Sequence, residues 1–302
     1  MLKIEYSKKF LDDYYTLIAT SKATKFQGLT FEKYYDKHYK QKIEYSLKEL
    51  LCGDFEKLTE IKEKHKTKLQ KDKSLQAFFN YDKNKSKTFR PLISKLQPKI
   101  SKYFEDNGNI HTCYFCNIDF INSFKTRKNE TKNGFTLDHF LDKATYPFLA
   151  LSIYNLIPSC YVCNSKVKGI NAIKAPAPTS KEFDFDNKVK FRTFIKNENL
   201  LVTNEDDFDL LLKEDFSNIY EEYINTLELN GRYEYHKYKV IEFINKRKLY
   251  PDSRIKELAQ MTQQTEEKVK HDLFGEFLIG DTLHKRPLSK LTKDIAKELE
   301  LL

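Results

Sequence analysis

NLIPSCYVCNSKVKG, residues 155–169, contains one of the two Cys-x-x-Cys pairs of this sequence, and CYFC, residues 113–116, contains the other. A gap of two residues lets both thiolates of a pair turn onto one ion, and four thiolates form the closed tetrahedral shell of a structural zinc site. The alternative is a set of four unconnected core cysteines. A closed shell has no position for a reacting water, so this zinc ion would be a scaffold and not a reagent. We expect structural Zn²⁺ bound by Cys113, Cys116, Cys160 and Cys163.

Four residues suited to hydrolysis lie between the pairs or directly after the second: Asp138, His139, Asn155 and Asn164. Carboxylate and amide oxygens are the ligands that hard divalent cations prefer, and a histidine can take a proton from water near neutral pH. These groups are what metal-assisted phosphodiester hydrolysis needs, with Mg²⁺ or Mn²⁺ as the reagent at Asp138 and Asn164. Because neighbouring side chains on a regular strand point to opposite faces, the strand that carries Asp138 and His139 must end or twist there.

CYFC (113–116), LDHF (137–140) and NLIPSCYVCNSKVKG (155–169) occur in the order that resembles HNH endonucleases of the ββα-metal class, in the subset whose core is held by a four-cysteine zinc site. The resemblance covers residues 111–175. It implies in-line attack of an activated water on phosphorus, one catalytic metal ion, and products with a 5′ phosphate and a 3′ hydroxyl.

The same resemblance implies a role for each of the four residues. Asp138 would be a metal ligand and His139 the general base. Asn155 would hold the loop and the histidine in place, and Asn164 would be the second metal ligand, at the position where the family name has its last histidine. Lys166 and Lys168 follow Asn164 on an expected helix and are candidates for phosphate contact, with plain solvated lysines as the alternative.

The charge is unevenly distributed along the chain. Residues 1–110 carry a net charge of +9, residues 111–180 carry +4 and residues 181–302 carry −4. A basic N-terminal part and an acidic C-terminal part indicate that one part of the molecule meets a polyanion. Most of the basic residues are lysines, which suit phosphate contact better than the reading of base edges, so we expect DNA binding with weak base specificity. A solvated lysine-rich surface is the alternative.

Apolar periodicity predicts an α+β chain, mainly helical around a small zinc-held ββα-metal core. Residues 31–51 have apolar residues at spacings of three or four, and the pattern continues in 54–70 and in 90–105, where Pro91 and Pro98 predict a helix broken into pieces. We expect three domains: a basic helical region at 1–108, the nuclease core at 109–178, and a strand pair with helices at 179–302.

The function expected from these features is a metal-dependent endonuclease acting on DNA in the cytoplasm. The N-terminus has no apolar leader, and no window of the sequence approaches the ~18 apolar residues of a membrane span. Residues 273–278 and 284–299 also resemble HNH proteins that accompany an ABC-type ATPase in Septu-like anti-phage defence, which implies such a partner. The alternatives are a zinc-held nucleic-acid-binding or adapter module without catalysis, and the same nuclease acting on RNA.

Overall fold

A computed structural model describes the chain in eight stretches: residues 1, 3–23, 26–79, 90–108, 111–196, 198, 202–275 and 286–301. The chain divides into two compact units, each built from segments that are not contiguous in sequence. Unit 1 comprises Met1–Leu2, His111–Phe120 and Asp184–Leu302, and unit 2 comprises Lys3–Ile110 and Ile121–Phe183. No helix in the described part of the chain is long and apolar enough to cross a membrane.

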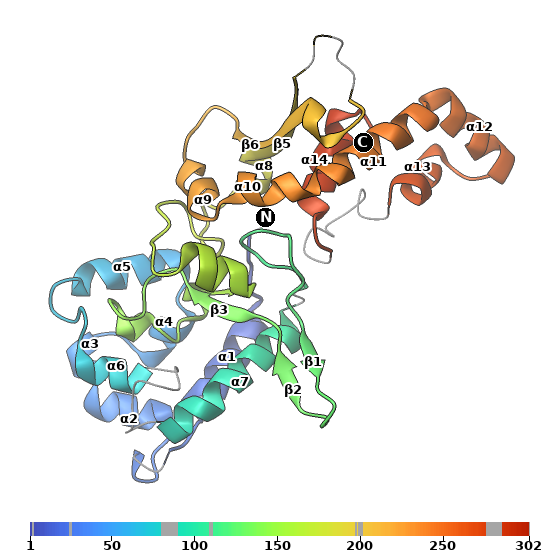
Figure 1. Ribbon diagram of the computed structural model, residues 1–302. Helices are drawn as coiled ribbons and strands as arrows, with labels where there is room; N and C mark the ends of the chain where they lie inside the picture. The colour runs from blue at the N-terminus through green and yellow to red at the C-terminus, as the bar shows by residue number, and fades with distance from the viewer. Residues whose placement is uncertain are drawn as a thin grey trace. The chain divides into compact units, whose positions relative to one another are not determined.

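The N-terminal segment of unit 2 is helical, as the apolar periodicity predicts (Figure 1). Its core is rich in aromatic rings; Phe31 and Phe78, for example, stack with their centroids 4.3 Å apart. The helices are α1 (Lys8–Ala19), α2 (Phe31–His38), α3 (Lys40–Ile43), α4 (Leu47–Cys52), α5 (Phe55–His65), α6 (Lys73–Phe79) and α7 (Arg90–Asn107).

Two details of these helices differ from the expectation. The periodic stretch 31–51 forms three helices: α2 ends at His38, and Glu44, in the left-handed conformation at φ 63°, ends α3 before Ser46 starts α4 with a reciprocal capping box to Glu49. The prediction that prolines break 90–105 is wrong, since α7 runs through Pro98 as one helix. Pro98 is exposed there, while Leu96 and its neighbours on the opposite face are buried, so packing holds the helix together across the missing N–H.

Short strands follow the helices in unit 2. Strand β1 (Ser123–Lys125) pairs with β2 (Thr131–Asn133), and β3 (Thr136–His139) pairs antiparallel with β4 (Leu156–Ser159). Each residue of β4 is buried, which fixes β3 against the interior of the unit. Two short 3₁₀ helices precede β4, η2 (Pro147–Leu149) and η3 (Ile153–Asn155), and a seven-residue π-helix, η4 (Val162–Lys168), follows it. Strand β3 ends at His139, and both Asp138 and His139 are paired residues of the strand, opposite Ile157 and Leu156.

Unit 1 pairs strand β5 (Val189–Ile195) with β6 (Phe208–Glu214) over seven residues. Tyr233 packs its ring 4.4 Å from that of Phe191 and donates its hydroxyl to the Cys116 carbonyl at 2.6 Å, which ties the first cysteine pair to the C-terminal helices. The helices are α8 (Phe185–Lys188), α9 (Glu221–Thr226), α10 (Leu229–Tyr233), α11 (Lys237–Leu249), α12 (Asp252–Thr262), α13 (Glu266–Phe274) and α14 (Ser289–Glu298), with 3₁₀ turns η5 (Glu205–Asp207) and η6 (Glu234–His236). Among the described residues, helices and three two-stranded sheets together are compatible with the expected α+β class.

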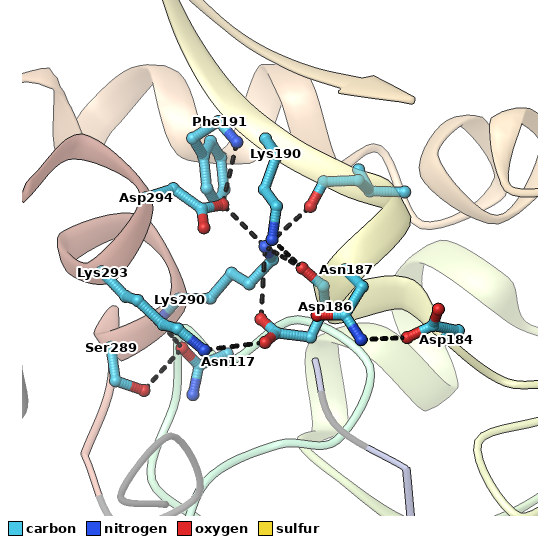
Figure 2. Close-up of polar contacts among 11 residues, drawn as sticks. Asn117, Asp184, Asp186, Asn187, Lys190, Phe191, Ser289, Lys290, Lys293 and Asp294 are labelled. Carbon is cyan, nitrogen blue, oxygen red and sulfur yellow. Dashed lines mark hydrogen bonds and ion pairs between the residues drawn. The ribbon is translucent and has the colours of Figure 1, made fainter. Parts of the chain in front are cut away.

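A buried cluster of charges joins α14 to β5 (Figure 2). The Lys290 side chain is fully buried, and its Nζ lies 2.6 Å from Oδ2 of Asp294, 3.3 Å from Oδ1 of Asp186 and 2.7 Å from the Val189 carbonyl oxygen. Asp294 Oδ2 also accepts the backbone N–H of Phe191 at 3.0 Å. Glu298, one turn further along α14, accepts the backbone N–H of Thr193 at 3.1 Å. Side chains of α14 therefore satisfy the edge of β5 that β6 does not cover.

Candidate active site

The four paired cysteines form one buried group. Their sulfur atoms all lie within 4.8 Å of one another. Backbone N–H groups point at two of these sulfurs, from Ile118 to Cys116 Sγ and from Cys163 to Cys160 Sγ, each at 3.4 Å. Such N–H donors stabilise thiolates, and four clustered thiolates are the donor set of structural zinc. The expected cluster is confirmed: Cys113, Cys116, Cys160 and Cys163 form a group that could hold a metal ion such as zinc.

Helix η4 packs against the face of strand β3 that carries Asp138, and Asn164 lies on this helix. Asn164 donates its amide nitrogen to Thr136 Oγ1 at 2.9 Å, and Lys168 lies against Asp138. Thr136 and Asp138 are two residues apart on β3, so they share a face and are separated by about 6.7 Å along the strand. Helix η4 thus runs along this face, with Asn164 beside Thr136 and Lys168 beside Asp138. The Asn164 amide nitrogen is used in the bond to Thr136, so its oxygen Oδ1 is the atom suited to ligate a cation.

Asp138 lies in an unusual environment for a carboxylate. The residue is 4% exposed, and its Oδ2 is buried without a hydrogen bond from any described residue. Lys168 Nζ lies 3.0 Å from Oδ2 as an ion pair and donates a hydrogen bond of 3.2 Å to Oδ1. Burial raises the pKa of Asp138 to about 6, although the Lys168 ammonium acts in the opposite direction. The cation beside this buried carboxylate in the structure is therefore the Lys168 ammonium group.

His139 contacts a different element from Asp138. Its Nε2 lies 2.9 Å from the carbonyl oxygen of Ala150, which follows η2. A carbonyl oxygen only accepts, so this contact places the proton on Nε2 and the lone pair on Nδ1. Burial lowers the pKa of His139 to about 3, so the imidazole is neutral at pH 7.

Asn155 connects the segments around the histidine. It is fully buried, and its Oδ1 accepts the Leu141 N–H at 2.6 Å. Its Nδ2 donates to the carbonyl oxygens of Leu141 and Leu149, each at 3.0 Å. The two ends of the loop between β3 and η3 therefore meet at one amide group, next to Ala150. The holding role expected of Asn155 stays a prediction, and these contacts are its physical basis.

The two candidate phosphate contacts on η4 differ in exposure. Lys166 is exposed, with its Nζ 5.9 Å above the ring of Tyr161, which is itself 58% exposed. Lys168 is 4% exposed and bound to Asp138, a contact that sequence reasoning missed. The available signal was the spacing, because residues 164 and 168 are four apart and share a helix face. With Asn164 against Thr136 of β3, Lys168 on the same face of η4 reaches Asp138.

Three lysines in α5 or directly after it, in the basic region expected to meet a polyanion, pair with glutamates. Lys64 Nζ lies 2.9 Å from Glu44, and Lys66 Nζ lies 2.7 Å from Glu63. Lys62 lies 3.5 Å from the same Glu63. Surface pairs of this kind are weak and screened by salt, so these lysines can exchange a glutamate for a phosphate.

The chain matches no protein-family model, no curated protein and no solved structure in comparisons with known proteins. Its function is therefore argued from the site itself.

Proposed function

We propose that this protein is an endonuclease that hydrolyses phosphodiester bonds of DNA with a divalent metal ion at Asp138 and Asn164. The observation that carries the proposal is the face of β3, where η4 brings the amide of Asn164 beside the strand that carries the buried Asp138 carboxylate. The HNH resemblance of residues 111–175 agrees with this set of side chains. Oxygen donors of this kind fit Mg²⁺ or Mn²⁺, and the four thiolates fit zinc.

Each of these residues has a separate role in the proposed hydrolysis. His139, neutral and with its lone pair on Nδ1, takes the proton of the attacking water, while the Ala150 carbonyl fixes its tautomer. Asp138 and Asn164 would hold the metal ion, which supplies positive charge to the phosphate and the leaving oxygen. Asn155 holds the loop that ends at Ala150. The exposed pair Lys166 and Tyr161 contacts the nucleic acid, through charge and ring stacking.

Cleavage of supercoiled plasmid by purified, zinc-loaded protein tests the proposal. Cleavage should require added Mg²⁺ or Mn²⁺ and should fall about 10²–10⁴-fold in His139→Ala, the range for loss of a general base. His38→Ala, which removes an exposed histidine of α2, is the matched control and should cleave like the wild type. Zinc content is measured in all three proteins, because a loss of zinc would mean a loss of the scaffold.

A zinc-loaded, folded wild type that cleaves neither plasmid nor single-stranded RNA with either metal ion would contradict the proposal and favour the adapter alternative. Cleavage of RNA alone would keep the chemistry and change the substrate. The defence role and the ATPase partner stay predictions; residues 276–278 and 284–285 of the two segments that carry this resemblance lie outside the described residues. Repeating the assay with a candidate ATPase tests that partnership.

A further inference from the structure

Lys168 is a buried lysine in the middle of the candidate site. Its residue exposure is 4%, and its Nζ lies 3.0 Å from Asp138 Oδ2, 3.2 Å from Oδ1 and 3.3 Å from the backbone carbonyl oxygen of His139. Lysines are almost never buried unless they are paired, because removing an ammonium group from water is costly. The chain thus places a cation of its own on the one carboxylate proposed to bind metal.

Two cations cannot share a single buried carboxylate without repulsion. At separations of about 4 Å, like charges repel by several kcal/mol at the effective dielectric of a protein. Both oxygens of Asp138 are already within 3.2 Å of Lys168 Nζ. A divalent ion that takes either oxygen as a ligand therefore meets the ammonium group at close range. Lys168 is the last residue of η4, so its side chain can leave without unwinding a following turn.

We propose that Lys168 is an internal counter-ion that competes with the divalent metal ion for Asp138, so that the metal binds only when the ammonium group withdraws. The inference rests on the proposed function, since it concerns the same carboxylate. It makes Lys168 a positioning residue that sets the metal concentration at which the site loads. In the metal-free protein Lys168 occupies the Asp138 carboxylate. The affinity of the site for a divalent ion is therefore lower than the same oxygen ligands would give without the lysine.

The test measures the affinity of zinc-loaded protein for Mn²⁺ in the absence of nucleic acid. The concentration of free Mn²⁺ is read from its electron paramagnetic resonance signal. Mn²⁺ prefers oxygen ligands, so it leaves the four thiolates to zinc. Lys168→Met removes the ammonium group and keeps an unbranched apolar stem. Lys168→Arg keeps a charge that forms bidentate pairs with carboxylates. Lys174→Met removes an exposed lysine a few residues away and is the matched control.

The competition predicts opposite changes in Mn²⁺ affinity for the two Lys168 variants. Lys168→Met should bind Mn²⁺ at least about tenfold more tightly than the wild type, and Lys168→Arg about tenfold more weakly, because a charge-assisted pair of this kind contributes about 1.5–3 kcal/mol. Lys174→Met should not change the affinity. If Lys168→Met does not fold, the weaker binding of Lys168→Arg still decides the question.

Two results would overturn the inference and can be told apart. Equal or weaker binding in Lys168→Met, or unchanged binding in Lys168→Arg, shows that the ammonium group does not compete, and plasmid cleavage by the wild type then leaves the proposed function standing. Absence of Mn²⁺ binding in wild type and both variants, together with absence of cleavage, removes the proposed function and the inference with it. Asp138→Asn should abolish the binding measured in the wild type, which identifies the ligand.

Discussion

Replacing Asn155 with alanine removes the amide group that joins the two ends of the loop before β4. Three hydrogen bonds are lost, one from the Leu141 N–H at 2.6 Å and two to carbonyl oxygens at 3.0 Å. Each contributes about 0.5–1.5 kcal/mol net, and a buried partner left without a bond adds a desolvation cost. We expect Asn155→Ala to lower the free energy of unfolding by about 2–4 kcal/mol, which for a unit of this size is about 5–15 °C in melting temperature.

The same substitution should reduce cleavage, because the loop leads to Ala150 and the Ala150 carbonyl holds His139. Thermal unfolding by circular dichroism measures the first effect, and plasmid cleavage below the melting temperature measures the second. Hydrogen exchange at the Leu141 amide locates the change, since this N–H loses its acceptor. Asn187→Ala is the matched control: its side chain makes one exposed bond to Asp184, so stability should change by less than about 0.5 kcal/mol.

A destabilisation by Asn155→Ala under about 1 kcal/mol would refute the reasoning on stability. Normal exchange protection at Leu141 would show that the loop does not depend on this amide. Unchanged cleavage by a variant with a raised exchange rate would refute the link from the loop to His139.

Three further predictions concern other parts of the molecule. Cys160→Ser should lower the zinc bound per chain and the melting temperature together, measured by metal analysis and calorimetry, because three thiolates hold zinc less tightly than four. Lys290→Met should cost about 3–5 kcal/mol in urea unfolding, since it leaves Asp294 buried without its cation, while exposed Lys297→Met should cost almost nothing. Burial raises the pKa of Asp138 to about 6 from 3.8, so the folded state binds the extra proton; in magnesium-free buffer, wild-type stability relative to Asp138→Asn should fall as pH rises from about 4 to about 6.

The cysteine cluster and the helical character of the N-terminal segment could be predicted from the sequence because each depends on short-range spacing. Two residues between paired cysteines bring their sulfurs together locally, and the apolar residues of 31–51 recur at helical intervals. The strand carrying Asp138 ends at His139, but both residues keep regular pairing with β4 and contact different elements, which the sequence argument did not anticipate.

Other features depend on contacts that spacing does not specify. The separation of α3 from α4 follows from the left-handed residue Glu44 and the cap at Ser46, while Pro98 stays inside α7 because Leu96 before it and Ile100 after it are buried. The pairing of Lys168 with Asp138 joins residues 30 apart in sequence. The sequence pattern indicates Lys168 and Asp138 as functional candidates, but it does not predict that the Lys168 ammonium pairs with the Asp138 carboxylate.

The outer edge of β5 shows how a helix can replace a strand. Residues 191 and 193 are about 6.7 Å apart along β5, and Asp294 and Glu298, four apart on α14, rise about 6 Å along the helix axis. Two carboxylates on one helical row therefore match two N–H groups on one strand edge. An uncovered edge is a template for strand addition by another chain. A chain truncated before α14 would expose the outer edge of β5 and would also lose the buried side chains of Leu291 and Ile295, so unit 1 would be prone to self-association through that edge.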